Sequence, residues 1–224
     1  MLEVSDGWRQ AFPGAAVGVL QMRAPGVGAH SGALEERKRR LEEEIRTRFE
    51  GATVADIRAL DVMQAYRDYY KAHRKTYHVQ LQLESLLFKG RGLPAVSPLV
   101  DVMFMAEMDN LLLTAGHDLD TVVLPLRLDV SKGDETYTLL NGTEQMLKAG
   151  DMFMADQRGV ISSVLYGPDR RTRMGPKTER AMFVVYAPRG VGEGRVRAHL
   201  EDIRESVLSL SSQCFVESLD VYVA

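Results

Sequence analysis

The chain contains very little cysteine and has no long apolar run. Its one cysteine, Cys214, excludes an internal disulfide bond and any zinc site made of several thiolates. The apolar neighbours of Cys214 predict a buried structural thiol. No stretch approaches the roughly 18 apolar residues that a membrane-spanning helix needs. Residues 1–10 carry Glu3, Asp6 and Arg9 in place of an apolar leader. We therefore expect a cytoplasmic protein with no membrane partner.

The signature motifs of nucleotide, metal and nucleophile sites are absent as well. The chain has no Walker-type phosphate loop, no G-x-G-x-x-G that opens a helix, no H-E-x-x-H and no G-x-S-x-G. Two of its histidines, His73 and His78, lie five residues apart and would not share one face of a helix. We therefore expect neither a metal ion nor a cofactor.

An excess of positive charge is also lacking. The 224 residues include 28 Lys and Arg against 31 Asp and Glu, a formal net charge of −3. This balance excludes binding of nucleic acid through bulk charge, so we expect no DNA partner and allow RNA only at a local basic patch. The hydrophobic share of 45% and the charged share of 26% are those of a globular protein.

Helical and strand patterns occupy different parts of the chain. Amphipathic or apolar helical patterns cover residues 33–49, 61–71, 78–88, 98–110 and 191–210. Short β-branched and aromatic runs, separated by turn residues, cover 14–22, 121–130, 136–140, 151–155, 160–166, 181–187 and 214–223. Helices on either side of a block of strands predict the α+β class and argue against a doubly wound nucleotide fold.

His117 is a candidate functional residue. It lies in the segment 114–120, which we expect to form a loop between a helix and the first strand of the sheet region. An imidazole can act as an acid or a base near neutral pH, and Asp118 or Asp120 could orient it. A structural turn in which the aspartates cap backbone amides is the alternative.

A run of cations follows residue 167. Arg170, Arg171, Arg173 and Lys177 lie between two expected strands, in what we predict to be an exposed hairpin. Forked guanidinium donors can bind phosphates. The alternative is a solvated loop in which the arginines pair with the local carboxylates Asp169 and Glu179.

The order of short motifs between Leu83 and Pro188 resembles the B3/B4 domain. That domain is the editing domain of the bacterial phenylalanyl-tRNA synthetase β subunit, and it also occurs as free-standing proteins. The motifs are Leu93-Pro94, Leu99-Val100-Asp101-Val102, His117 to Asp120, Gly133-Asp134-Glu135, Leu140-Asn141-Gly142, Gly150-Asp151 and Thr178. The resemblance implies a single domain over residues 1–224, with a mixed or antiparallel sheet or sandwich core at about 83–188 flanked by helices.

The resemblance also implies a site. In the synthetase this domain holds an amino-acid pocket where wrongly attached tyrosine is hydrolysed from tRNA. Carried over, it implies a catalytic His117, with substrate contacts expected from Phe104, Asp118, Ser163, Tyr166 and Gly167. The run of cations separately predicts RNA contacts from Arg170, Arg171, Arg173 and Lys177. Phe104 replaces the asparagine of the family's V-D-x-x-N, and no carboxylate stands near Val184. Phe104 predicts a smaller or more apolar pocket, and the two departures together favour a binding module over synthetase-like recognition of tyrosine.

Three functions are compatible with these features. The first is hydrolysis of mischarged aminoacyl-tRNA in trans, which a positioned water could perform without a protein nucleophile because the ester is already activated. The second is a non-catalytic module that binds an amino acid, a related small molecule or an RNA end. The third is a protein-interaction domain whose pocket is filled by side chains such as Phe104 and Tyr166.

Overall fold

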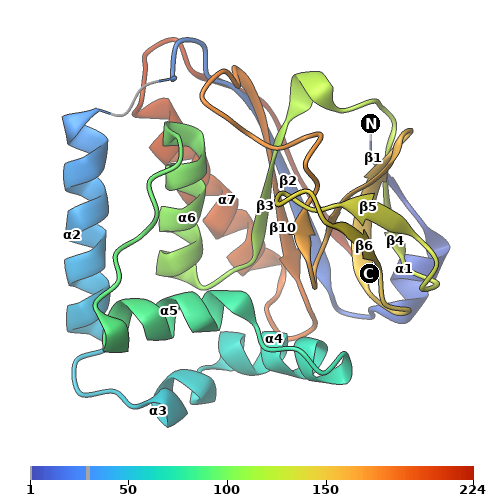
Figure 1. Cartoon of the computed structure of the whole chain (residues 1–224), viewed down its shortest axis with the longest axis horizontal. Helices are drawn as coiled ribbons and strands as arrows, with labels where there is room; N and C mark the ends of the chain where they lie inside the picture. Colours follow the sequence, from blue (N-terminus) through green and yellow to red (C-terminus); the bar gives the residue numbers. More distant parts are fainter. Residues whose placement is uncertain (1, 29–30) are drawn as a thin grey trace.

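Two β-sheets that lie against each other form the centre of the molecule (Figure 1). The computed structural model describes residues 2–28 and 31–224, so His30 lies outside the described residues. One sheet is antiparallel throughout, with the strand order β11 (Phe215–Val223), β2 (Ala16–Arg23), β10 (Arg180–Ala187) and β3 (Thr114–Asp118). A hydrogen bond between the hydroxyls of Tyr186 on β10 and Ser162 on β8 links it to the second sheet.

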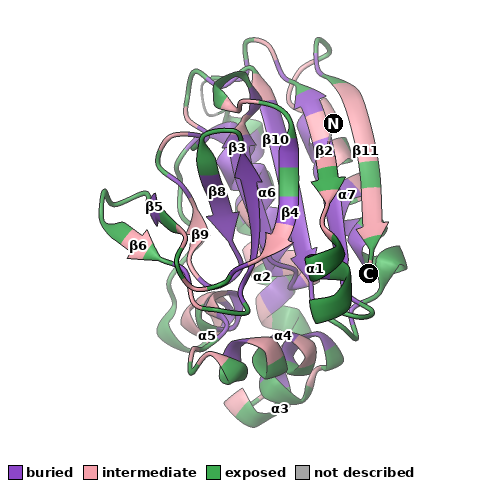
Figure 2. Cartoon of the chain, turned by 90° about the vertical axis from the view of Figure 1, so that its right-hand side faces the viewer, coloured by how far each residue is buried: buried purple, intermediate pink, exposed green. Residues whose placement is uncertain are grey.

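The second sheet is mixed. Its strand order is β1 (Leu2–Val4), β4 (Leu126–Val130), β7 (Met152–Asp156), β8 (Gly159–Ser163) and β9 (Gly167–Pro168), and the β1–β4 pair is parallel. A small hairpin of β5 (Thr136–Thr138) and β6 (Glu144–Met146) extends beside it. Figure 2 shows that β10, between β2 and β3 in the antiparallel sheet, is almost continuously buried. This burial explains the uninterrupted apolar run of β10, because both of its faces are covered.

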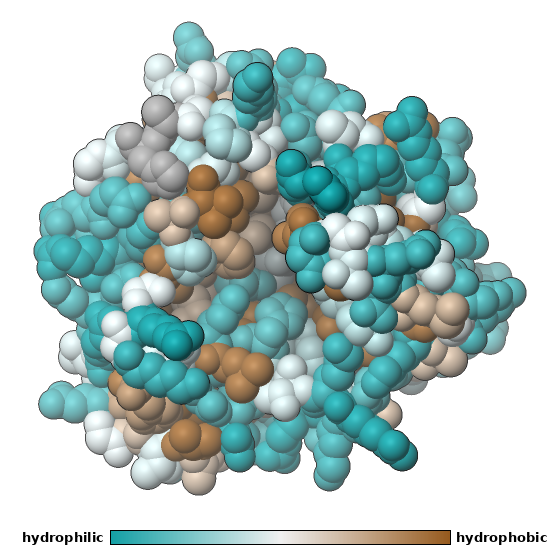
Figure 3. All heavy atoms as spheres, viewed as in Figure 1, coloured by the Kyte–Doolittle hydropathy of each residue, from teal (hydrophilic) through white to brown (hydrophobic). Residues whose placement is uncertain are grey.

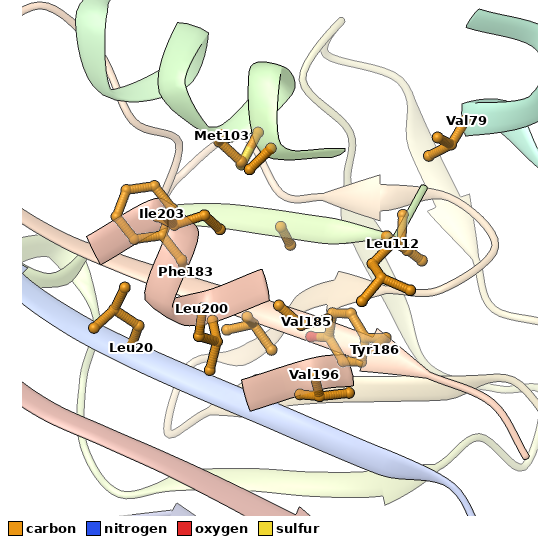
Figure 4. Close-up of a cluster of buried hydrophobic side chains, with 14 of the residues drawn as sticks. Leu20, Val79, Met103, Leu112, Phe183, Val185, Tyr186, Val196, Leu200 and Ile203 are labelled. Carbon is orange, nitrogen blue, oxygen red and sulfur yellow. The ribbon is translucent and has the colours of Figure 1, made fainter. Parts of the chain in front are cut away.

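Helices cover the outer face of the antiparallel sheet. α7 (Glu193–Leu208) packs on it so closely that a Cβ on Gly18 of β2 would lie 2.6 Å from Val196 Cγ1, which explains the glycine at that position. In Figure 4, Phe183 and Val185 of β10 lie beside the apolar side chains of α7. The remaining helices are α1 (Asp6–Ala11), α2 (Gly32–Arg48), α3 (Val54–Ala59), α4 (Asp61–Ala72), α5 (His78–Lys89) and α6 (Pro98–Asn110).

A buried ion pair ties α2 to the start of α6. Lys38 Nζ lies 2.9 Å from Asp101 Oδ2, and both residues are buried. Asp101 Oδ1 accepts a hydrogen bond of 2.8 Å from the backbone N–H of Val96. The carboxylate therefore holds both the helix pair and the loop that precedes α6.

The α+β class and the mixed and antiparallel sheets confirm the sequence prediction, and Cys214 is buried as expected. Two segments differ. Residues 114–118 form strand β3 and not a loop, because this weakly apolar segment pairs with β10 along its whole length. The strand expected at 121–130 begins only at Leu126, after a 3-10 turn at Leu119–Thr121, and Pro125 has no N–H for a ladder hydrogen bond. No helix of the described chain is long and apolar enough to cross a membrane.

Candidate functional site

A cavity of about 430 Å³ opens at the outer edge of β3. β3 is the last strand of its sheet, so no further strand of that sheet lies against this edge. The cavity extends from there between α6 and the segment that runs from β9 to β10. Figure 3 shows a hollow in the middle of the face turned toward the viewer, with apolar side chains around it.

The cavity wall is mainly apolar. α6 contributes Val100, Met103 and Phe104, and the opposite wall includes Pro168 and Met174. Two further apolar side chains, Val96 and Leu140, line the cavity although each is about half exposed (51% and 49%). A concave apolar site with a few polar groups is typical of pockets for small ligands. The open cavity argues against a pocket filled by Phe104 and Tyr166.

Glu107 is an acidic group on this wall. It lies on α6 and is 1% exposed, and its Oε1 accepts a hydrogen bond of 2.8 Å from the backbone N–H of Thr114. Burial raises the pKa of the Glu107 carboxyl to about 8. No sequence motif marks this residue, although an acidic residue between Ala106 and Met108, in a helix that is apolar on nearly all sides, is a signal of a buried functional group.

His78, at the start of α5, lines the same cavity. Its Nδ1 lies 3.1 Å from the hydroxyl oxygen of Tyr70, which donates its own proton to Val164 O at 2.6 Å. His78 Nδ1–H must therefore be the donor to Tyr70, which leaves Nε2 as an acceptor. Burial and the charge of Lys75 lower the pKa of His78 to about 4, so the ring is neutral at physiological pH.

A second hollow, of about 640 Å³, borders the first and is lined by arginines. Arg158, Arg170, Arg171 and Arg173 line it, together with polar residues of the β5 strand. Arg173 lines both hollows, so the apolar cavity and the arginine-lined groove share a boundary.

The cations expected to form one exposed hairpin differ in their environments. Arg171 is half-buried, and its Nη1 and Nη2 each donate a hydrogen bond of 2.8 Å to Asp156, which is not local in sequence. Its Nε also lies 3.7 Å from the carboxylate of Asp169, one of the two local partners expected in the solvated-loop alternative. Arg170, Arg173 and Lys177 are exposed and form no ion pair with any described residue. Lys177 lines neither hollow.

His117 lies within β3 and is completely buried. Its Nδ1 lies 2.7 Å from the hydroxyl of Thr172, which in turn donates to Asp169. His117 Nδ1–H is therefore the donor, and the buried Nε2 has no hydrogen-bond partner among the described residues. Burial and Arg171 lower the pKa of His117 to about 3. The imidazole is not among the groups that line the cavity, so a catalytic role for it stays a prediction.

Some of the other residues expected to contact the substrate line the cavity, and others lie outside it. Phe104, Ser163 and Gly167 line the cavity. Asp118 caps the amide of Asp120 at 3.2 Å and accepts a hydrogen bond of 2.9 Å from Thr178, as in the structural-turn alternative. Tyr166 packs under Lys75, whose Nζ is 4.1 Å from the ring centroid, and is not on the wall. Within the described part of the chain, no three His, Cys, Asp or Glu residues are grouped so that they could hold a metal ion.

The burial of His117 changes the expected effect of its removal. His117→Ala should lower the free energy of unfolding by about 1–3 kcal/mol, because it leaves a cavity in the sheet and removes a partner of Thr172. A surface-loop histidine would cost far less. Urea unfolding of the variant, with the exposed Lys177→Ala as its control, measures this. An unfolding free energy equal to that of the wild type would contradict it.

Comparison with known proteins places the chain in a family. A family model described as the B3/4 domain matches residues 63–199. A search of curated proteins gives no match. Among solved structures, the chain is similar to an N-terminal fragment of the phenylalanyl-tRNA synthetase β-subunit from Pyrococcus horikoshii, with a TM-score of 0.48 and 11% sequence identity; the alignment covers 99% of this chain and 50% of that one. Because the family model spans more than half of the chain, the protein belongs to the B3/4 domain family.

Proposed function

We propose that this protein binds the aminoacylated 3′ end of tRNA in the cytoplasm and hydrolyses the ester of a mischarged amino acid in trans. One observation carries the proposal: Arg173 lies at the boundary between an apolar cavity and an arginine-lined groove. A ligand that has an apolar side chain close to phosphate groups would occupy both at once. Membership in a family that includes a tRNA editing domain agrees with this ligand class.

The chemistry requires little from the protein. A water attacks the ester carbonyl carbon, the bond to the ribose oxygen breaks, and the proton that leaves the water ends on that ribose oxygen. The neutral His78 could orient the water through its Nε2 acceptor. Ser163, on the same wall, carries a hydroxyl that could bind the ester group.

Arginine substitutions test the RNA-binding part. Arg170→Gln combined with Arg173→Gln should weaken binding of a mixed tRNA pool and lower the salt slope by roughly one for every phosphate group that the variant no longer binds. Folding should be retained, since both residues are exposed and unpaired within the described chain. Binding at several salt concentrations measures both quantities, and Arg189→Gln, an exposed arginine that lines neither hollow, is the matched control. Equal affinities and slopes would rule out this RNA interface.

A panel of mischarged tRNAs tests the hydrolytic part. The protein should release the amino acid from at least one of them faster than buffer does, and the double arginine variant should be slower. If no tRNA in the panel is deacylated, hydrolysis is ruled out.

A non-catalytic binding module is the second candidate. The observation that favours it is the position of His117, whose ring is bonded to Thr172 and lies away from the cavity wall. This candidate predicts that a free amino acid raises the thermal stability of the protein, while none of the mischarged tRNAs is deacylated.

A further inference from the structure

Glu107 is a buried carboxyl group that no cation of the described chain neutralises. It lines the apolar cavity, and the N–H of Thr114 is its one hydrogen-bond donor there, at Oε1. Oε2 accepts no hydrogen bond from residues 2–28 or 31–224. Removing a carboxylate from water is costly unless a partner compensates for it. The cavity beside Glu107 could therefore accept a cation or a strong hydrogen-bond donor from a ligand, because no described residue supplies one to its Oε2.

The groups packed around Glu107 stay uncharged near neutral pH. On α7, burial lowers the pKa of His199 to about 3, and on α5 the pKa of His78 is about 4. Burial raises the pKa of three tyrosines on and after α4, namely Tyr66, Tyr70 and Tyr77. Among these neighbouring side chains, Glu107 is therefore the one whose charge changes between pH 6 and 9.

Two cationic side chains in this part of the molecule do not pair with Glu107. Lys38, from α2, is paired with Asp101 at the other end of α6. Arg173 lines the same cavity but forms no ion pair with Glu107. The cavity thus offers an acidic group and a separate basic group on otherwise apolar walls.

We propose that Glu107 binds the α-ammonium group of the amino acid, so that the pocket takes ligands with a free α-amino group and rejects N-acylated ones. This inference rests on the proposed function for the kind of ligand. The side chain then lies against the apolar wall, while Arg173 faces the carboxylate of a free amino acid or the phosphates of a tRNA end. N-acylation abolishes the ammonium charge and adds bulk beside a buried carboxylate. Peptidyl-tRNA would be excluded for the same reason.

Proton release is the characteristic sign of this contact. The free protein holds Glu107 protonated at neutral pH, and an arriving ammonium group favours the carboxylate, so the proton leaves to solvent. Binding should therefore tighten with rising pH, by up to about tenfold for each pH unit below 8. A merely structural Glu107 would produce neither the proton release nor this pH dependence.

Calorimetry tests the inference with free leucine, methionine, phenylalanine and tyrosine and with the N-acetyl form of each. Titrations at pH 7 in two buffers that differ in ionisation enthalpy count the protons released. Wild type should bind at least one free amino acid at least tenfold more tightly than its N-acetyl form and release close to one proton. Glu107→Gln should lose at least tenfold in affinity together with the proton release. Glu50→Gln, at an exposed carboxyl with no ion pair to a described residue, should behave as wild type.

The outcomes separate this inference from the proposed function. Equal binding of free and acetylated forms, binding of neither, or an unchanged affinity in Glu107→Gln would overturn the role of Glu107. The proton count on wild type decides the matter if the variant does not fold. Because tRNA binding and deacylation are assayed independently, they can succeed when the ammonium contact fails, and the reverse also holds.

Discussion

Asp101→Ala is expected to lower the free energy of unfolding by about 3–5 kcal/mol, the usual cost of removing one partner of a buried ion pair. The substitution removes the buried carboxylate 2.9 Å from the Lys38 ammonium, which is 5% exposed and keeps the half-exposed Glu35 as a weaker partner at 3.3 Å. It also removes the acceptor of the Val96 amide. The loop before α6, which lines the cavity, should loosen as a result.

A double-mutant cycle tests whether the lower free energy of unfolding comes from the buried Lys38 charge that Asp101→Ala leaves behind. Replacing both partners, as in Lys38→Met with Asp101→Leu, should recover most of the stability, because no buried charge is left unpaired. Arg39→Ala, which breaks exposed ion pairs with Glu36 and Glu43, should lower the free energy of unfolding far less than Asp101→Ala does. If Asp101→Ala unfolds at the same denaturant concentration as the wild type, the ion pair does not stabilise the fold.

The second large effect concerns the dependence of stability on pH. The folded protein binds the Glu107 proton up to about pH 8, whereas the carboxyl of an unfolded chain loses it near its ordinary value of 4.5. The folded state therefore binds more protons throughout this window. Stability should fall as pH rises from about 4.5 to 8, by roughly 4 kcal/mol in total from this group.

Other buried groups act at lower pH. Burial lowers the pKa values of His117 and His199 from 6.5 to about 3 and that of His78 to about 4, so the unfolded state binds more protons than the folded state and stability drops as pH falls below 6.5. Burial raises the pKa of Asp151 to about 6, which opposes part of this drop. We expect greatest stability close to pH 6.

Denaturant unfolding at pH 6 and pH 9 tests the contribution of Glu107. Wild type should lose several kcal/mol between the two pH values, whereas Glu107→Gln should lose far less and should be the more stable protein at pH 9. Glu50→Gln should follow the wild type. A variant with the same loss as the wild type would show that another group is responsible.

Elements with a strong local pattern could be predicted from the sequence. The helix at 98–110 and the strand at 181–187 are long or strongly apolar, and their bounds agree with α6 and β10 to within one residue. β3 lacks such a pattern: the residues Thr-Ala-Gly-His-Asp become a strand only because β10 offers them a partner from a distant part of the chain. Pairing of this kind leaves no periodic signal in a single sequence.

The site was harder to predict for the same reason. His117 was a candidate because aspartates neighbour it in the sequence, but its position on β3 buries the imidazole completely. His78 and Glu107 reach one cavity from two helices, a proximity that depends on how α5 and α6 pack. Phe104 and Arg173 were named from the sequence and line the cavity, whereas the two acid–base groups of its wall, His78 and Glu107, were recognised only in the tertiary structure.

The position of β2 has a consequence for synthesis of the protein. β2 is made long before its two neighbours in the sheet, β10 and β11, which follow some 160 to 200 residues later in the sequence. At the usual rate of about 5–20 residues per second, this strand waits roughly eight to thirty seconds on the ribosome before β10, the first of its partners, exists. During that wait its apolar face is open to chaperones, and closure of the sheet must bring together the most distant parts of the chain.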